Sequence, residues 1–344
     1  MKKIGFLSFG HWSDGAGSRV RSAAESLRQS VELAVAAEEI GLGGAYFRVH
    51  HYAAQQSSPF PLLATIAART RALEVGTGVI DMRYETPLHL AEQAASLDLL
   101  AGGRVRLGIG RGSPETADRG YRYFGHVPAE GQTVADLARE HTASFLSAIE
   151  GAGIATLDPA RGRGSGLLSI TPVSPGLRER ILWGAGNLDT AIWAARRGMQ
   201  LMSSTDILED KGIPFDKLQR EQIEGFRQAW QEAGWSWASH VTVVRSIVPL
   251  IDDLSRAYFG ARAGAEEGPG VFQGISYRFG GSFTGTPEEL VAHLRADVAV
   301  AAADAVLVTV PSHLGVDFNV RQLTAIHAIG QELGWTDRAA AGSR

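Results

Sequence analysis

Cysteine is absent from this chain of 344 residues. The absence excludes disulfides, thiolate nucleophiles, cysteine-held iron–sulfur clusters and cysteine-ligated zinc, and it is typical of the reducing cytoplasm. Long apolar runs are lacking too, since no stretch approaches the roughly 20 apolar residues that a membrane helix needs. The amino-terminal MKKIGFLSFGHWSDG is interrupted at His11 and Asp14, before the apolar region of a signal peptide would be complete. We therefore expect a cytoplasmic protein without a membrane span.

An excess of charge of one sign is also missing. The net charge is −4 and the basic residues are scattered, which argues against nucleic acid or anionic lipid as a partner. The chain contains neither a G-x-S-x-G elbow nor a Gly-Lys-Ser/Thr loop. The motifs of an α/β-hydrolase and of a P-loop NTPase are therefore both missing. The glycines around Gly110 fail as a dinucleotide-binding signature because the third one is misplaced.

The chain does contain a regular alternation of short apolar runs and longer amphipathic ones. Apolar residues make up 44% of the sequence, enough for a sizeable core. We predict eight strands, at residues 3–9, 45–50, 73–79, 105–109, 181–183, 199–203, 241–248 and 305–310. Eight parallel strands in chain order favour a closed (β/α)₈ barrel, formed by residues 1–344 as a single domain. An open, doubly wound sheet is the alternative.

Helices are predicted between these strands from apolar residues spaced near 3.6, as at Leu27, Val31 and Ala34, or at Leu90, Ala94 and Leu97. Three local signals mark helix ends. Thr86–Pro87 and Thr286–Pro287 are typical of helix starts, and Gly41 is typical of a helix end.

Three stretches interrupt the alternation, namely residues 111–130, 152–180 and 253–285. The last of these holds eight glycines. Beside the open end of a barrel, a glycine-rich insertion over 253–285 could act as a mobile lid. A surface insertion without function is the alternative.

The carboxyl ends of the strands are where a barrel of this kind carries its site. His50 and His51 are placed at the end of the second strand, where at most one of them can face the barrel mouth. No spacing among Asp81, His89 and Asp206 resembles a metal signature, so we expect no metal site.

Two glycine-rich strand ends predict anion binding. Arg111 follows the fourth strand, and its planar guanidinium suits a phosphate. The fifth strand ends in a turn through Gly186 and Asn187, which opens a helix whose free amides, with Thr190, could bind an anion. A plain helix cap by Asn187 is the alternative, and a carboxylate at Asp189 would disfavour phosphate if it pointed inward.

The stretch from Ser58 to Gly112 resembles the bacterial luciferase-like, or class C flavin-dependent, monooxygenases. Its motifs are SPFPLL, VGTGV, TPLHLAEQAASLDLLAGGR and RLGIGRG. The segments KIGFLSF, WGAGNLDTAIWAARRG, GTPEEL and LVTVPSHLG agree with the same family. The resemblance is weakest over residues 113–180 and 250–283, and it implies a (β/α)₈ barrel.

The resemblance implies an enzyme in which reduced FMN at the barrel mouth reacts with O₂ to a C4a-peroxyflavin that oxygenates a small organic substrate. By the same resemblance, His50 would protonate or stabilise the peroxyflavin. The flavin ring would lie beside Thr77, Gly78 and Val79, a segment that often includes a non-proline cis bond in relatives. The phosphate would bind Arg111, Thr190 and the amides of Gly186 and Asn187.

Further partners also follow from the resemblance. A separate NAD(P)H:flavin reductase would supply the reduced flavin, and a homodimer is expected. Relatives commonly carry glutamate where this chain has Val49, which argues against a shared substrate. Asp81 and Arg83 stand where relatives are often apolar, which predicts a more polar substrate cavity. An oxidoreductase that depends on the deazaflavin F420 and a non-catalytic flavin-binding protein are the alternatives.

Overall fold

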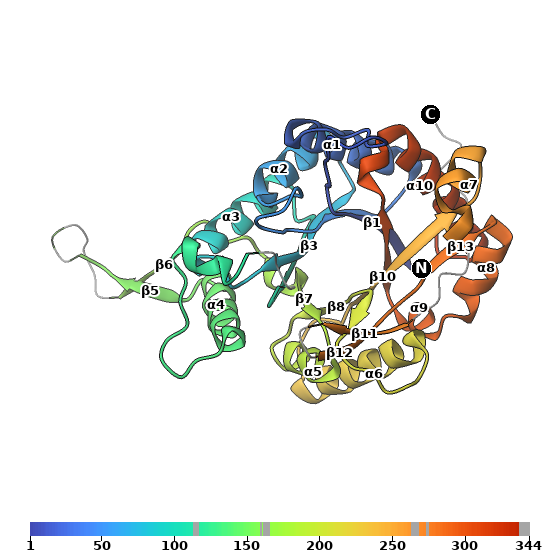
Figure 1. Ribbon diagram of the computed structural model, residues 1–344. Coiled ribbons are helices and arrows are strands. Elements are labelled where there is room, and N and C mark those ends of the chain that lie inside the picture. The colour runs from blue at the N-terminus through green and yellow to red at the C-terminus, as the bar shows by residue number, and fades with distance from the viewer. Residues whose placement is uncertain (113–116, 159, 161–165, 263–267, 273–274, 337–344) are drawn as a thin grey trace.

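The computed structural model describes residues 1–112, 117–158, 160, 166–262, 268–272 and 275–336. Eight parallel strands close into a barrel, as predicted (Figure 1). In order around the barrel they are β1 (Lys3–Ser8), β2 (Gly44–Phe47), β3 (Glu74–Asp81), β4 (Val105–Gly110), β7 (Ile181–Ala185), β8 (Gln200–Ser203), β10 (Val241–Pro249) and β14 (Ala305–Val310). The pairing of β8 with β10 and of β14 with β1 completes the circle, so the open-sheet alternative is wrong.

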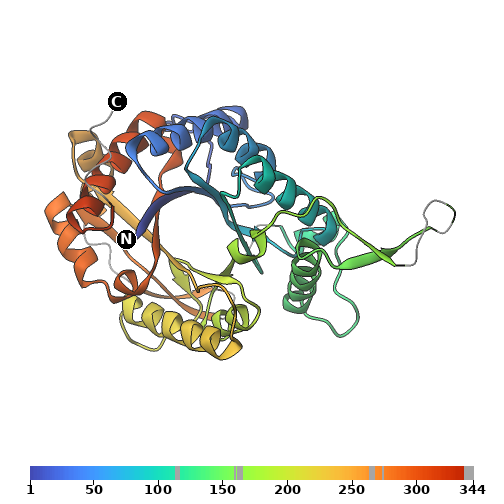
Figure 2. The same cartoon turned by 180° about the vertical axis from the view of Figure 1, so that it is seen from behind.

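Helices cover the outside of the barrel on all sides (Figure 2). They are α1 (Ala23–Ile40), α2 (Pro59–Arg69), α3 (Pro87–Leu100), α4 (Val134–Ile149), α5 (Leu188–Arg196), α6 (Phe215–Ala233), α8 (Pro287–Ala296), α9 (Val298–Ala302) and α10 (Val316–Glu332). The predicted ends are confirmed: Thr286 caps α8 in a capping box with Glu289, and Gly41 ends α1 at a φ of 98°. In α1, however, Leu27 is 42% exposed and does not belong to the core.

The strands are apolar on both faces because both are covered. Outward side chains pack against the helices, while Leu7, Tyr46, Leu182, Met202, Val244 and Leu307 fill the barrel lumen. The Tyr46 ring fits only because Gly76 has no side chain, since a Cβ there would lie 2.6 Å from the ring. Below it, the Glu74 carboxylate accepts from Arg106 Nε at 2.9 Å and from Lys3 Nζ at 2.6 Å, which closes the amino-terminal end with paired charges.

An ion pair is buried between β10 and the helix layer. Arg245 and Asp297 are each 3% exposed, and the guanidinium donates to both carboxylate oxygens, at 2.8 and 3.1 Å. Asp297 also accepts from the Val300 amide and thereby caps α9. The pair fixes where α8 ends and α9 begins, because neither charge can be left unpaired without a large penalty.

Two predicted irregular stretches contain more structure than expected. Within residues 152–180, β5 (Gly153–Thr156) and β6 (Leu167–Ser169) form an exposed antiparallel hairpin that projects from the barrel (Figure 1). Within residues 253–285 lie α7 (Asp253–Phe259), β11 (Gly268–Phe272), β12 (Ile275–Phe279) and β13 (Ser282–Gly285). Residues 113–116, 159, 161–165, 263–267 and 273–274 of the predicted stretches lie outside the described residues.

The range 253–285 is therefore not one insertion. β13 pairs in parallel with the end of β10 and belongs to the barrel wall. The hairpin β11–β12 instead pairs with β9 (Asp206–Ile207), a short strand that follows β8. The part that can cover the barrel mouth is thus the β11–β12 hairpin.

Candidate functional site

A cavity of about 440 Å³ lies at the carboxyl ends of the barrel strands. Its lining comes from seven strands of the barrel and from Arg48, Val49 and His50 just after β2, which is where a fold of this kind places its ligands. Seven of the eight site residues predicted from the sequence line it: His50, Gly78, Val79, Arg111, Gly186, Asn187 and Thr190. Thr77 is fully buried instead, and its hydroxyl donates to the Gly108 carbonyl at 2.7 Å, so it joins β3 to β4 below the cavity.

The turn that carries Arg111 is shaped by the residue after it. Gly112 has a φ of 87°, and a Cβ there would lie 1.9 Å from Asp81 Oδ2, so only glycine fits. Asp81 is held in turn by Arg83, whose Nε donates to it at 2.9 Å. This packing leaves Arg111 exposed at the cavity rim, where its guanidinium can meet an anion.

The β3 wall of the cavity contains a cis peptide bond between Gly78 and Val79. The Val79 side chain crosses the ends of β4 and β7, where Gly110 and Gly184 leave room for it. A Cβ at Gly110 would lie 3.1 Å from Val79, and one at Gly184 would lie 3.0 Å away. Val79, Gly110 and Gly184 together line this side of the cavity.

At the start of α5, the plain helix cap is present. The Asn187 side chain accepts from the Thr190 amide at 2.9 Å, and the Thr190 hydroxyl accepts from the Asn187 amide at 3.3 Å. The Leu188 amide donates to Glu209 Oε1 at 3.2 Å. A carboxylate of the chain itself therefore occupies part of the helix end that the sequence predicted as a phosphate site.

The structure separates His50 from His51. His50 lines the cavity, whereas His51 is buried, stacks on Tyr84 with ring centroids 4.3 Å apart and is not among the residues that line the cavity. The prediction that both end a strand is wrong, because β2 stops at Phe47 and the His50 amide donates to the Gln56 carbonyl outside the sheet. Burial lowers the pKa of His50, and Arg48 and Arg83 lower it further, so its imidazole is neutral near pH 7.

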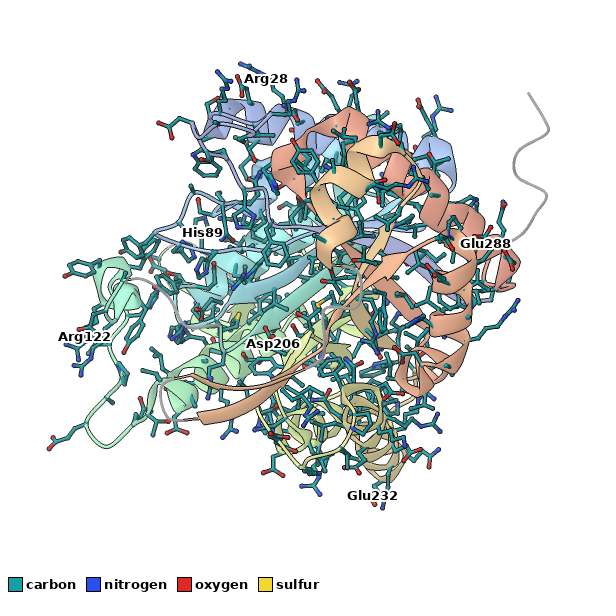
Figure 3. The ribbon with its side chains drawn as sticks, turned by 45° about the vertical axis from the view of Figure 1, so that its right-hand side comes forward. Arg28, His89, Arg122, Asp206, Glu232 and Glu288 are labelled. Carbon is teal, nitrogen blue, oxygen red and sulfur yellow. The ribbon has the colours of Figure 1, made fainter. Side chains whose placement is uncertain are left out.

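Three charged residues of the cavity were not predicted as parts of an organic ligand site. Arg139 reaches it from α4 and also lies over the Trp193 ring, 5.4 Å from its centroid. Arg48 reaches it from the end of β2, and Asp206 from the first residue of β9 (Figure 3). Arg139 lies within helix α4 and Asp206 lies in β9 beyond the end of β8, so neither directly follows a predicted strand.

Within the described part of the chain, no group of three or more His, Asp or Glu side chains could hold a metal ion. In the same residues, no helix has both the length and the apolar character to cross a bilayer.

A family model and several curated proteins resemble the chain. The family model described as luciferase-like monooxygenase matches residues 1–304. The 4-hydroxyprotoasukamycin monooxygenase of Streptomyces nodosus subsp. asukaensis is 41% identical over 90 residues, which are 26% of this chain and 24% of that protein. Matches to the first curated relatives span between a quarter and a third of the relatives' length.

Solved structures agree over nearly the whole chain. The oxygenating constituent of 3,6-diketocamphane monooxygenase from Pseudomonas putida, in complex with FMN, has a TM-score of 0.68 at 15% identity and covers 95% of this chain and 97% of that one. An F420-dependent secondary alcohol dehydrogenase in complex with an F420–acetone adduct has a TM-score of 0.63 at 15% identity and covers 98% and 99%. At these identities the likeness concerns the fold.

Proposed function

The chain belongs to the luciferase-like monooxygenase family, and we propose that it is the oxygenase of a two-component system that uses reduced FMN and O₂ to oxygenate a small organic substrate. The observation that carries the proposal is the cavity of about 440 Å³, where a cationic rim, a glycine-lined wall and a neutral histidine lie together. When bound there, reduced FMN would supply the electrons that activate O₂.

The residues present fit a flavin mononucleotide. Its planar ring needs a wall without long side chains, and Gly78, Val79, Gly110 and Gly184 line the cavity on this side. Its phosphate needs cations and free donors, and Arg111 and Arg139 supply charge at the same rim. In this proposal Thr190 and the Gly186 and Asn187 amides complete the phosphate site.

Glu209 must be accommodated in any such complex. Its carboxylate accepts from the Leu188 amide, and a phosphate that approached this amide would meet a negative charge. We expect the phosphate to displace Glu209 towards Lys211, whose Nζ lies 3.6 Å from the other carboxylate oxygen.

His50 is the proposed catalytic residue. A neutral imidazole carries a proton on one ring nitrogen and accepts one on the other, so His50 can hold a proton next to the reacting oxygen. The lowered pKa of His50 limits unwanted protonation, because the imidazolium form is scarce at neutral pH.

The β11–β12 hairpin is the proposed shield of the reaction from water. It is tied to the cavity edge by β9, which begins at the cavity residue Asp206, and by Arg278, whose Nη2 lies 3.0 Å from Asp210 Oδ1. Excluding water favours oxygenation over release of hydrogen peroxide.

A separate reductase is the proposed partner, since the sequence contains no dinucleotide-binding signature. A homodimer is proposed as the assembly, on the resemblance stated above. The reduced flavin would then diffuse into the cavity or be transferred at its mouth.

Anaerobic titration with reduced FMN tests the proposal, followed by mixing with O₂. We expect saturable binding, O₂ consumption, and binding at least tenfold weaker in Arg111→Ala, since a hydrogen bond to a charged group contributes about 1.5–3 kcal/mol. The Arg28→Ala variant, changed on the exposed face of α1 away from the cavity (Figure 3), is the control.

The outcomes separate the alternatives. Absence of saturable binding of reduced FMN, together with substrate-dependent reduction of F420, would replace the proposal with the F420-dependent oxidoreductase. Saturable FMN binding with reoxidation kinetics that His50→Ala leaves unchanged would favour the non-catalytic flavin-binding protein.

A further inference from the structure

The cavity has two walls that differ in chemistry. The ends of β3, β4 and β7 form the wall that we assign to the flavin, so the present inference rests on the proposed function. The opposite wall comes from β1, β8, β10 and β14 and from the segment after β2. It is the wall left for the organic substrate.

The chemistry of the second wall follows from the layers of side chains in the barrel lumen. Successive side chains of a strand point to opposite faces, so every second residue points into the lumen. Met202 on β8 and Leu307 on β14 belong to the apolar layer that fills the lumen. Ser204 and Thr309 stand two positions further along the chain and line the cavity above that layer. The lumen thus changes from apolar to hydroxyl-bearing where the cavity begins.

Three hydroxyls of this wall have no hydrogen-bond partner among the described residues. They belong to Thr309, Ser204 and the adjacent Thr205, which all line the cavity and are partly buried. Ser246 on β10 differs, because its hydroxyl accepts from Ser282 Oγ at 3.0 Å and it is not among the residues that line the cavity. The hydroxyls left without a partner are therefore those that a ligand in the cavity can reach.

Thr309 lies across the cavity from the flavin wall. β14 is four strands away from β4 in both directions around the barrel, and β4 ends at Gly110 on the flavin side. Ser204 and Thr205 follow β8, two strands from β14, and so lie at one side of the space between the walls. A substrate in this space would contact the flavin ring on one side and the Thr309 hydroxyl on the other.

The charges of the second wall offset one another. Arg48 and Asp206 both line it, and their charges are opposite. Burial raises the pKa of Asp206 and the attraction of Arg48 lowers it, so the two groups lie close enough to interact. His50 is neutral near pH 7, as described above. The wall therefore offers hydrogen bonds without a net charge, which favours a neutral substrate over an acid or an amine.

Covering the three hydroxyls with an apolar ligand would be unfavourable. Each hydroxyl can donate one hydrogen bond and accept others, and an apolar ligand would exclude water from it without replacing these bonds. A site that hydrogen-bonds its substrate therefore rejects an analogue without the polar group far more strongly than an apolar pocket rejects a smaller analogue.

We infer that Thr309 is a specificity-determining residue for a neutral organic substrate that carries a hydroxyl or carbonyl oxygen. The Thr309 hydroxyl would donate to this oxygen and hold the substrate against the flavin ring. Ser204 and Thr205 would extend the polar surface towards β8, for the further oxygens of a larger substrate.

Four ligands that share one aromatic ring test this inference. The protein is saturated with oxidised FMN, and the dissociation constants of benzyl alcohol, toluene, benzoate and benzylamine are measured by ligand-observed NMR titration. We expect benzyl alcohol to bind wild type more tightly than benzoate or benzylamine. Thr309→Val keeps the shape of the side chain but removes its hydroxyl, so it should weaken benzyl alcohol about three- to tenfold and leave toluene unweakened. Thr324→Val, on the exposed face of α10 and outside the cavity, should change neither.

Three results would overturn the inference. They are benzyl alcohol that binds wild type no better than benzoate or benzylamine, benzyl alcohol that Thr309→Val leaves unchanged, and toluene that this variant weakens as much as benzyl alcohol. The FMN titration of each variant is a separate reading. If FMN saturates wild type and Thr309→Val equally while one of these results is found, the substrate inference fails alone. If FMN saturates neither, the proposed function fails as well.

Discussion

Replacing Glu209 with glutamine is expected to tighten FMN binding about fivefold. The Glu209 carboxylate accepts the Leu188 amide at 3.2 Å, at the positive end of α5, where a phosphate would also be attracted. Ligand binding must therefore break or weaken an existing charged contact. Glutamine keeps an oxygen that can accept the amide, but it removes the negative charge.

The expected change in FMN affinity follows from how strongly the helix end stabilises the Glu209 carboxylate before FMN binds. A hydrogen bond to a charged group contributes about 1.5–3 kcal/mol, and a charge at a helix end about 0.3–1 kcal/mol. The Glu209 side chain is 27% exposed and has Lys211 3.6 Å away, so solvent and the lysine already offset part of this gain. Relieving about 1 kcal/mol corresponds to about fivefold in the dissociation constant.

Fluorescence quenching of FMN in a titration with protein measures the effect. Asp189→Asn is the matched control, because it removes an exposed carboxylate from the same first turn of α5 that makes no side-chain hydrogen bond to the described residues. The gain in Glu209→Gln should shrink as salt rises, since charges near the surface are screened. Unchanged or weaker binding in Glu209→Gln, or an equal gain in Asp189→Asn, would refute the reasoning.

Three further predictions concern stability and coupling. Burial raises the pKa of Glu85 to about 7, above its ordinary 4.5, so the carboxyl's contribution to stability is fully present below pH 4.5 and is lost as pH rises through 7. In urea titrations, Glu85→Gln should thus raise the free energy of unfolding by about 2 kcal/mol more at pH 8 than at pH 5. An equal effect of the substitution at the two pH values would contradict the raised pKa of Glu85. Asp297→Ala should cost about 3–5 kcal/mol in the same assay, because it strands the buried Arg245 charge, and a loss below about 1 kcal/mol would contradict this. Replacing Pro269–Arg278 with Asn-Gly, which rejoins the paired residues Gly268 and Phe279, should leave FMN affinity within about twofold but raise the hydrogen peroxide formed per O₂ consumed; an unchanged peroxide yield would reject the hairpin as a shield.

Much of the fold could be predicted because barrel strands covered on both faces leave a plain apolar signal. All eight predicted strands are present, with boundaries that differ by a few residues. Helix ends could be predicted where the capping geometry requires a particular residue type, as at Thr286 and Gly41. Leu27 was misplaced because helical periodicity alone does not say which apolar residue faces the barrel.

The candidate site could be predicted where backbone geometry dictates the residue. Glycine is required at position 112 because no other residue fits beside Asp81, so the turn that carries Arg111 could be recognised from the sequence. The sequence does not single out Arg139 or Arg48, since an arginine on a helix or at a strand end is equally typical of a solvated surface. Glu209 meets Leu188 through a contact across 21 residues, which no local pattern encodes.

The circular order of the strands places the two walls of the cavity in different stretches of the chain. Residues 74–112 and 181–190 build one wall, while the first 50 residues and those from 200 onward build the other. Under the proposed function, mutational libraries confined to the second set, with His50 and Glu209 left unchanged, would explore new substrates without altering how the flavin is held. Gene segments exchanged between relatives would have to include both stretches, the one before β3 and the one from β8 onward, to transplant selectivity and leave the redox half in place.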